Sequence, residues 1–364
     1  MESLTNQQYK ISTYSELTNI HIETPSMTIG RKVKANWDAI AKPLDSMGAF
    51  EDIICKIGSI LGTDKIDVSK KAVIIMCADN GIVEEGVSQC GHEVTLAVAK
   101  SMAKKQSSVG KMASHIKADT IPVDIGINSS EEVEGLLNKK VRKGTRNFLK
   151  EEAMTSEEAL KAISTGIDMV RNCKDKGYKL LATGEMGIGN TTTSSAIAAA
   201  LLGCKVEDVT GRGAGLSDKG LERKIAVIKE ALDKYDLRDK DPFTILRTVG
   251  GLDIAGLTGL CIGGALYHVP IVLDGFISMA AGLVAERICP GVKDYLISSH
   301  NGKEPAIKLI LEELSLKPVI DASLALGEGT GSVMLFSLLD MAMCIYDNQT
   351  SFQDIEVEEY QRLV

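Results

Sequence analysis

The chain has 364 residues, of which 44% are hydrophobic and 25% charged, a composition typical of soluble globular enzymes. Its net charge of −8 argues against general nucleic-acid binding, although it is compatible with a local anion site. The N-terminal segment lacks the pattern of a signal peptide and the apolar runs are too interrupted to span a membrane, so we expect a cytoplasmic protein with no membrane partner.

The predicted elements alternate along the chain, after a polar segment of about twenty residues that we expect to form an arm. Helical patterns occur at 30–61, with a break at Lys42-Pro43, and at 93–117, 155–174, 192–202, 220–237, 248–267 and 332–345. Apolar runs typical of buried strands occur at 72–78, 120–126, 178–183 and 270–275, with a weaker candidate at 318–321. This alternation predicts an α/β fold whose mainly parallel, Rossmann-like sheet is covered by helices on both faces.

We assign residues 71–330 to a large α/β domain. A smaller helical domain is expected from the two ends of the chain, residues 1–70 (including the arm) and residues 331–364. The eight cysteines form no CxxC pair and have no histidine at zinc-ligand spacing. Most of them lie in apolar runs, so we interpret them as small buried side chains in a reducing compartment.

Polar and glycine-rich segments follow several predicted strands, at 79–81, 184–187 and 274–275. Ligands of parallel α/β sheets bind beyond the carboxyl ends of the strands. We therefore expect these segments to surround one cleft, together with the Gly-Glu-Gly-Thr-Gly sequence at 327–331.

Residues 327–331 place one carboxylate among three glycines, just before the last apolar helix. Unpaired N–H groups and the positive dipole end at a helix start favour an anion or a polar ligand. Glu328 is therefore either a helix-capping acid or a catalytic base, and the segment in isolation favours capping.

The segment 184–193 joins a strand to a helix through three glycines and a run of threonines. It is neither a P-loop nor a GxGxxG fingerprint, but backbone N–H groups and hydroxyls there suit a phosphate. An Asn/Thr-capped tight turn is the alternative. A second glycine-rich segment, 211–215, is followed by Lys224 and also suits an anion, although Arg212 and Lys224 are equally consistent with surface charges.

Further blocks occur at 42–48, 78–81, 85–87, 123–126, 144–147 and 153–155. In this order, and together with the three glycine-rich segments, they resemble the nicotinate-nucleotide–dimethylbenzimidazole phosphoribosyltransferase family of cobamide lower-ligand synthesis. The resemblance implies that the 5-phosphoribosyl group of nicotinate mononucleotide moves to 5,6-dimethylbenzimidazole or a related base. Nicotinate is released, and the α-ribotide product serves cobamide nucleotide-loop assembly.

The resemblance also implies roles for individual residues. Glu328 is the general base that takes the proton of the attacking base, and Glu185 positions the ribose or stabilises positive charge. Expected around the phosphoribosyl group are Gly187, Ile188, Gly189, Asn190, Thr191, Thr192, Gly213, Lys224, Asp274 and Gly275, with Ser299 as a weaker candidate. No metal or other cofactor is implied, because a mononucleotide donor has no pyrophosphate to neutralise.

Expected around the acceptor base are Cys90, Val98, Met186, Leu326 and Gly327. Cys90 and Val98 stand where family members often carry polar groups, so another benzimidazole, a purine or a phenolic base remains open as the preferred acceptor. Asn80 stands where the family commonly has histidine, and a lone loop histidine such as His92 is more often structural than substrate-binding.

The implied partners are the two small-molecule substrates and a second copy of the chain in a homodimer. One alternative is a subunit of a hetero-oligomer with a paralogue, activating phenolic or purine bases. The other is a nucleotide-binding oxidoreductase, which is disfavoured because residues 78–81 lack the required glycine spacing.

Overall fold

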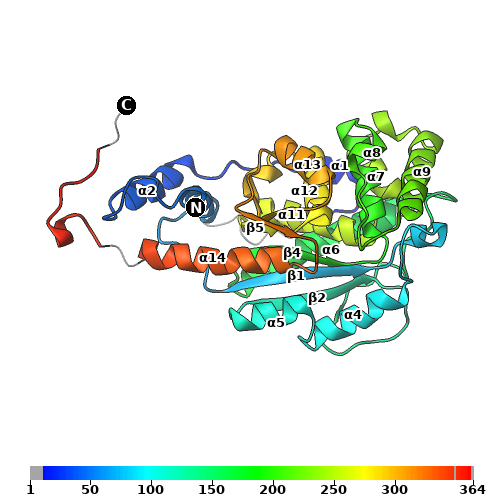
Figure 1. Cartoon of the computed structure of the whole chain (residues 1–364), viewed down its shortest axis with the longest axis horizontal. Coiled ribbons are helices and arrows are strands. Elements are labelled where there is room, and N and C mark those ends of the chain that lie inside the picture. The colour runs from blue at the N-terminus through cyan, green and yellow to red at the C-terminus, as the bar shows by residue number, and fades with distance from the viewer. Residues whose placement is uncertain (1–10, 348–349, 362–364) are drawn as a thin grey trace.

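The computed structural model describes residues 11–347 and 350–361, and every structural statement below concerns these residues. Its centre is a parallel sheet in the order β3-β2-β1-β4-β5-β6 (Figure 1). The strands are β1 (Lys71–Ala78), β2 (Asp119–Gly126), β3 (Leu137–Asn138), β4 (Leu180–Met186), β5 (Ile271–Leu273) and β6 (Leu296–Ser298). The predicted parallel α/β fold is confirmed.

The continuous apolar run of β1 follows from burial on both faces of the sheet. All eight of its residues are buried. Successive side chains of a strand point to opposite faces. Ile74 and Met76 accordingly join one hydrophobic cluster, while Val73 and Ile75 join the other.

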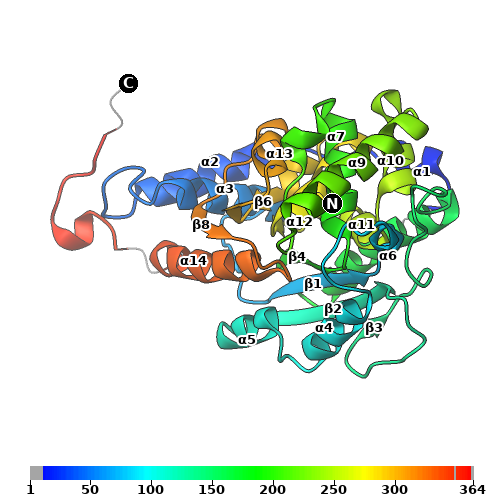
Figure 2. The same cartoon turned by 45° about the vertical axis from the view of Figure 1, so that its right-hand side comes forward.

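Helices cover both faces of the sheet (Figures 1 and 2). One face carries α6 (Ser156–Asp175), α7 (Asn190–Leu202), α10 (Pro242–Val249), α11 (Leu252–Leu266) and α12 (Phe276–Ile288). The other carries α4 (Glu93–Ala103), α5 (Ser108–His115) and α14 (Thr330–Asp347). Around these lie α1 (Tyr14–Thr18), α2 (Met27–Asp38), α3 (Ala49–Leu61), α8 (Val206–Val209), α9 (Asp218–Lys234), α13 (Ala306–Leu314) and a small parallel sheet of β7 (His300–Gly302) and β8 (Ile320–Leu324). Short 3-10 turns occupy Gly81–Glu85, Leu237–Asp239, Val292–Tyr295 and Gln353–Ile355.

Two predicted helices are each divided in the structure. The helix expected at 93–117 is α4 and α5, because Lys105 adopts a left-handed conformation (φ 55°) and Ser107 caps α5 by accepting the N–H of Gly110 at 3.2 Å. The helix expected at 248–267 is the end of α10 and all of α11, separated at residues 250–251.

The polar N-terminal segment does not extend as an arm over its described part. Leu17 of α1 is fully buried, and Tyr14 stacks on Phe243 with ring centroids 4.8 Å apart. Residues 1–10 lie outside the described residues.

We propose that the two ends of the chain form the smaller helical domain, residues 1–70 with 331–364, beside a large domain of 71–330. In support, α2 and α3 pack with α14: the rings of Trp37 and Tyr346 lie 5.2 Å apart, and the Asn36 amide donates to the Tyr346 hydroxyl at 2.9 Å. Side chains of β1 belong to the same hydrophobic cluster, so these helices share a core with the sheet.

Candidate active site

A cavity of about 250 Å3 lies at the carboxyl-terminal edge of the six-stranded sheet, beside the ends of β4 and β5. The chain passes from β1 to β2 on one side and later enters β4 on the other side of β1, so the strand order reverses here. Open α/β sheets bind ligands at such reversal points. The cavity therefore lies where the sequence predicts a cleft.

Most of the predicted site residues line this cavity. They are Val98, Glu185, Met186, Gly187, Ile188, Asn190, Thr191, Gly213, Asp274, Gly275, Leu326, Gly327 and Glu328. Thr192, Lys224 and Ser299 are fully buried behind the wall, and Gly189 lines a smaller neighbouring cavity. Cys90 is exposed and lines neither cavity.

The loop between β4 and α7 forms one wall of the cavity. Gly187 packs so closely on the end of β1 that an added Cβ would lie 2.4 Å from the carbonyl oxygen of Ala78. Gly189 has a φ of 93°, which favours glycine, and α7 begins at the next residue, Asn190. The positive dipole end of a helix start suits a phosphate, although here the N–H groups of Asn190 and Thr192 already donate to the carbonyl oxygens of Gly187 and Gly189, at 3.2 and 2.9 Å.

A buried lysine supports this wall from α9. The Lys224 ammonium donates to the Thr191 hydroxyl at 2.9 Å and to the Gly211 carbonyl oxygen at 3.1 Å. Burial lowers the pKa of Lys224 to about 8, and the Glu304 carboxylate acts in the opposite direction. Lys224 therefore offers a positive charge directly beneath a cavity-lining hydroxyl.

Glu304 occupies the other side of this corner. Its Oε1 accepts the Gly213 N–H at 3.0 Å, while its Oε2 is buried with no hydrogen-bond partner. The carboxylate lies against Gly211, where an added Cβ would meet Oε2 at 2.1 Å. Glu304 therefore requires Gly211 to be small, whereas at Gly213 an added Cβ would lie 2.7 Å from the Thr191 hydroxyl oxygen.

Glu185 is a carboxyl group at the end of β4 and faces the cavity. Burial raises the pKa of Glu185 to about 8, and the nearby Asp253 and Asp274 act in the same direction. The Asn190 amide donates to its Oε2. Gly327 leaves the room for its Oε1, since a Cβ there would lie 2.6 Å away.

Asp274, not Glu328, caps the last helix. Its carboxylate accepts the backbone N–H groups of Gly329, Gly331 and Ser332 at 3.1, 2.8 and 3.2 Å. Burial raises the pKa of Asp274 to about 7, although the three N–H groups favour its charged form. Because Asp274 accepts the N–H groups at the start of α14, Glu328 is not needed to cap this helix.

Glu328 instead reaches across the cavity wall to another helix. It is half-buried, lines the cavity and adopts a left-handed conformation with a φ of 63°. Its Oε2 accepts the Val109 N–H, in the first turn of α5, at 3.1 Å. A single hydrogen bond leaves the other carboxylate oxygen available as a proton acceptor.

The cavity also has an apolar section. It is formed by Val98, Met186, Phe276, Ile277, Ile307, Leu324 and Leu326. A small number of placed polar groups within an otherwise apolar lining is typical of sites for small organic ligands. The cavity therefore combines an anion corner, a group of carboxyls and an apolar surface.

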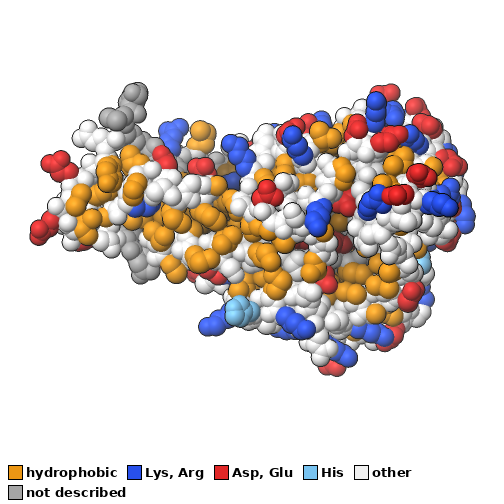
Figure 3. Space-filling model, in the orientation of Figure 1, with side chains coloured by type: hydrophobic (Ala, Val, Ile, Leu, Met, Phe, Trp, Pro, Cys, Tyr) orange, Lys and Arg blue, Asp and Glu red, His pale blue; other side chains and the backbone are white. Residues whose placement is uncertain are grey.

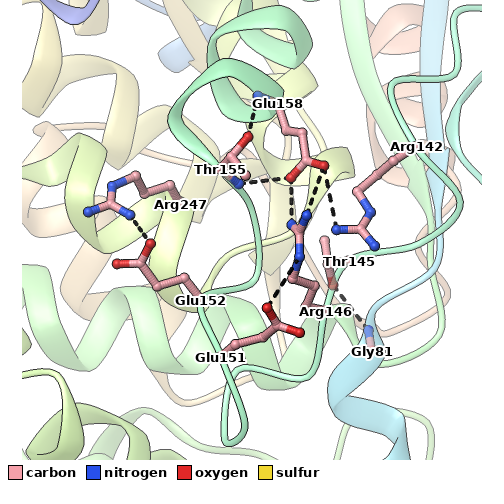
Figure 4. A network of polar contacts seen from close by, with 9 residues as sticks. All are labelled: Gly81, Arg142, Thr145, Arg146, Glu151, Glu152, Thr155, Glu158 and Arg247. Carbon is pink, nitrogen blue, oxygen red and sulfur yellow. Dashed lines mark hydrogen bonds and ion pairs between the residues drawn. The ribbon is translucent and has the colours of Figure 1, made fainter.

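A polar network holds the loop 144–155 next to this site (Figure 4). Arg146 binds Glu158 through two nitrogens, at 2.6 and 3.2 Å, and Glu158 also accepts the Thr155 N–H at 2.8 Å. The Thr145 hydroxyl accepts the Gly81 N–H at 3.0 Å. The neighbouring Asn80 donates to the Ile188 carbonyl oxygen at 3.4 Å. The network therefore supports the loop between β4 and α7.

Among the site residues that the sequence analysis missed are three titratable ones, Asp253, His300 and Glu304. Asp253 starts an all-apolar helix, so its pattern resembles an ordinary acidic first turn. His300 lines the cavity and bonds Ser299 at 2.9 Å, and burial lowers its pKa. A polar run at 298–304 follows β6 at the same edge of the sheet. This run is the sequence pattern that could have indicated His300 and Glu304.

Comparison with known proteins gives consistent results. A family model described as DBI_PRT, phosphoribosyltransferase, matches residues 22–357. A nicotinate-nucleotide–dimethylbenzimidazole phosphoribosyltransferase of Clostridium acetobutylicum is 45% identical over 332 residues, covering 91% of this chain and 94% of the relative. One of Acetivibrio thermocellus is 46% identical over 329 residues, covering 90% and 94%. A crystal structure of CobT from Thermus thermophilus superposes with a TM-score of 0.86 at 34% identity, covering 92% of this chain and all of that one.

Proposed function

The chain belongs to the family of nicotinate-nucleotide–dimethylbenzimidazole phosphoribosyltransferases, and we infer that it transfers the 5-phosphoribosyl group of nicotinate mononucleotide to an aromatic base. The observation that supports this reaction best is a group of three carboxyls: half-buried Glu185 and buried Asp274 line the cavity, and fully buried Asp253 is joined to Glu185 by the Asn190 amide. Among the described residues, no ion pair joins any of them to a lysine or arginine. The pyridinium ring of the donor carries a positive charge, which this group of carboxyls would attract.

The bond changes follow from the donor's chemistry. A ring nitrogen of the acceptor forms a bond to C1′ of the ribose as the bond from C1′ to the pyridinium nitrogen breaks. The bonding electrons neutralise the pyridinium, which leaves as nicotinate. Glu328 takes the proton from the second acceptor nitrogen, and Glu185 stabilises the positive charge that the ribose carries in the transition state.

We propose that the phosphate of the donor binds at the start of α7. The positive end of the α7 dipole, the Thr191 hydroxyl and the Lys224 ammonium all lie at one corner of the cavity. A positive dipole end, a hydroxyl donor and a cation at one place favour a phosphate monoester. The apolar section with Val98 and Met186 then remains for the acceptor base.

The acceptor preference is tested by a turnover assay with nicotinate mononucleotide and a panel of dimethylbenzimidazole, other benzimidazoles, adenine, phenol and p-cresol. We expect benzimidazoles to be preferred over adenine, because Val98 offers no partner to the extra polar atoms of a purine. Val98→Gln should raise the kcat/KM for adenine relative to dimethylbenzimidazole about fivefold, which corresponds to one net hydrogen bond. Val94→Gln, one turn earlier on α4 and outside the cavity lining, is the matched control.

A preference for adenine in the unmodified enzyme, or an unchanged ratio in Val98→Gln, would contradict this account of the acceptor pocket. Turnover of phenol or p-cresol alone would favour the alternative of a subunit that activates phenolic bases with a paralogue. The names of the relatives and the geometry of the site do not favour that alternative, so we do not propose it.

We further propose a homodimer formed through α14. This helix is long and apolar enough to cross a membrane, but 56% of its length is buried in the fold. Its outer face still exposes Met334 (39%), Met341 (58%) and Ile345 (37%). Hydrophobic side chains form a band over the part of the surface where Figure 1 places α14 (Figure 3). Contiguous apolar surface of this kind marks protein interfaces.

Light scattering after size exclusion is expected to give twice the chain mass for the unmodified protein and a single chain mass for Met341→Glu. Leu137→Glu, an equal change at a side chain that is 40% exposed on β3, should leave the dimer intact. A monomeric unmodified protein, or a dimer that persists in Met341→Glu, would show that α14 is not the interface.

A cytoplasmic location is proposed as well. None of the eight cysteines, all of which lie in the described part of the chain, forms a disulfide, and two of them, Cys90 and Cys344, are exposed. Exposed thiols persist in reducing compartments.

A further inference from the structure

Asp253 is the least accessible acid near the cavity and has no assigned role. It is the second residue of α11 and is fully buried. It lies behind the loop between β4 and α7 and does not line the cavity. A buried carboxyl group carries a large desolvation cost unless its hydrogen bonds are satisfied. The contacts that it makes therefore indicate what it is for.

A single amide group joins Asp253 to Glu185. The Nδ2 of Asn190 donates to Oδ2 of Asp253 at 3.2 Å and also to Oε2 of Glu185. An amide nitrogen has two hydrogens, so these two contacts use both of them. The opposite orientation would place the amide oxygen against two acids, and the two carboxyl groups therefore fix which way Asn190 points.

The surroundings of Asp253 leave it little freedom to move. Its Oδ1 accepts the Ile254 N–H at 3.0 Å. Glycines make room for both oxygens: a Cβ on Gly187 would lie 2.7 Å from Oδ2, and one on Gly251 would lie 2.3 Å from Oδ1. Asn80 completes the enclosure: a Cβ on Gly251 would also lie 2.4 Å from the buried side-chain oxygen of Asn80.

We propose that Asp253 is a positioning residue of the active site, which orients the Asn190 amide so that Asn190 in turn holds the Glu185 carboxyl at the cavity wall. This proposal rests on the proposed function, because that function assigns Glu185 its role in stabilising the positive charge of the ribose. The charge of Asp253 also contributes to the raised pKa of Glu185. The other titratable groups around Glu185 or on the same cavity are Asp274 after β5, Glu328 before α14, Cys77 on β1, His300 on β7, and Lys303 and Glu304 just after β7.

The proposal is tested by a double-mutant cycle on kcat with Asp253→Ala, Asn190→Ala and the double variant. Each single change should lower kcat by about ten- to a hundredfold, because a positioning group lost from a buried network misplaces the reacting side chain. If Asp253 acts through Asn190, the double variant loses no more than Asn190→Ala alone. Losses that multiply would overturn the proposal.

The Asp253→Asn variant provides a second test, which does not depend on the alanine variants folding. It keeps an acceptor oxygen for Asn190 and removes the charge, so kcat should stay within about fivefold of the unmodified enzyme. Removing a negative neighbour lowers the pKa of Glu185. We expect ionisation of Glu185 to set one acidic limb of the kcat profile, and this limb should therefore move to lower pH. An unmoved limb, or a kcat as low as that of Asp253→Ala, would contradict the proposal.

Asp124→Asn is the matched control. Asp124 is another buried acid of the sheet, near the end of β2, where it pairs with Lys140 at 3.0 Å and accepts the Ile127 N–H at 2.9 Å. This change should leave the pH profile in place. Absence of turnover in the unmodified enzyme would count against the proposed function itself, whereas normal turnover with multiplying losses would count only against the role of Asp253.

Discussion

Replacing Glu328 with glutamine is expected to lower kcat by about 10²- to 10³-fold while changing the KM for nicotinate mononucleotide less than about threefold. Glutamine has the same shape and still accepts the Val109 N–H that Glu328 now accepts at 3.1 Å. It has no basic oxygen for the acceptor proton. The loss should therefore fall on the chemical step, and a thermal melt should show that the fold is retained.

Asp340→Asn is the control for Glu328, because it removes one negative charge from α14 outside the cavity. Asp340 pairs with Lys71 at 2.6 Å and is 42% exposed, and asparagine keeps an oxygen for the Lys71 ammonium, so kcat should stay within about twofold. A Glu328→Gln enzyme with kcat near that of Asp340→Asn would show that another group accepts the proton.

Replacing Lys224 with methionine is expected to raise the KM for nicotinate mononucleotide by about 30- to 100-fold, with a smaller effect on kcat. Methionine occupies a similar volume, so the fully buried stem stays packed. The donor phosphate loses its cation, and Glu304, whose charge Lys224 offsets, then repels it. Removing one partner of a buried charge pair costs about 2–5 kcal/mol, which covers the expected change.

In the unmodified enzyme, the KM for nicotinate mononucleotide should rise as the pH is raised. Burial lowers the pKa of Lys224 to about 8, so its ammonium loses its proton above that pH and the KM for the donor should increase. Lys229→Met is the matched control: the same change on α9, at a side chain that is 48% exposed and pairs with Glu207. An unchanged donor KM in Lys224→Met would remove Lys224 from the phosphate site.

The central strands of the sheet were predictable because they are largely buried on both faces and are therefore mostly apolar. Strand β1 shows this most clearly, with eight buried residues followed directly by Asp79 and Asn80. Elements without such contrast were missed. The buried helix α12 is apolar all round, which removes the helical period, and β6 has only three residues.

The general place of the site was also predictable, since parallel strands bring their carboxyl ends to one edge. The contacts within it were not, because they join residues far apart in the chain. Asp274 caps α14 from 55 to 58 residues away, and Asn190 meets Asp253 across 63 residues. Cys90, expected at the acceptor base, lies in an exposed loop whose conformation no local pattern determines.

The central claim is tested most directly by incubating the purified chain with nicotinate mononucleotide and dimethylbenzimidazole and following both products by chromatography. The account predicts that nicotinate and the α-ribotide form in equal amounts, only when both substrates are present, and that Glu328→Gln abolishes most of both. Nicotinate release without ribotide would indicate a hydrolase. No reaction with any base of the panel would contradict the proposed function of this cavity.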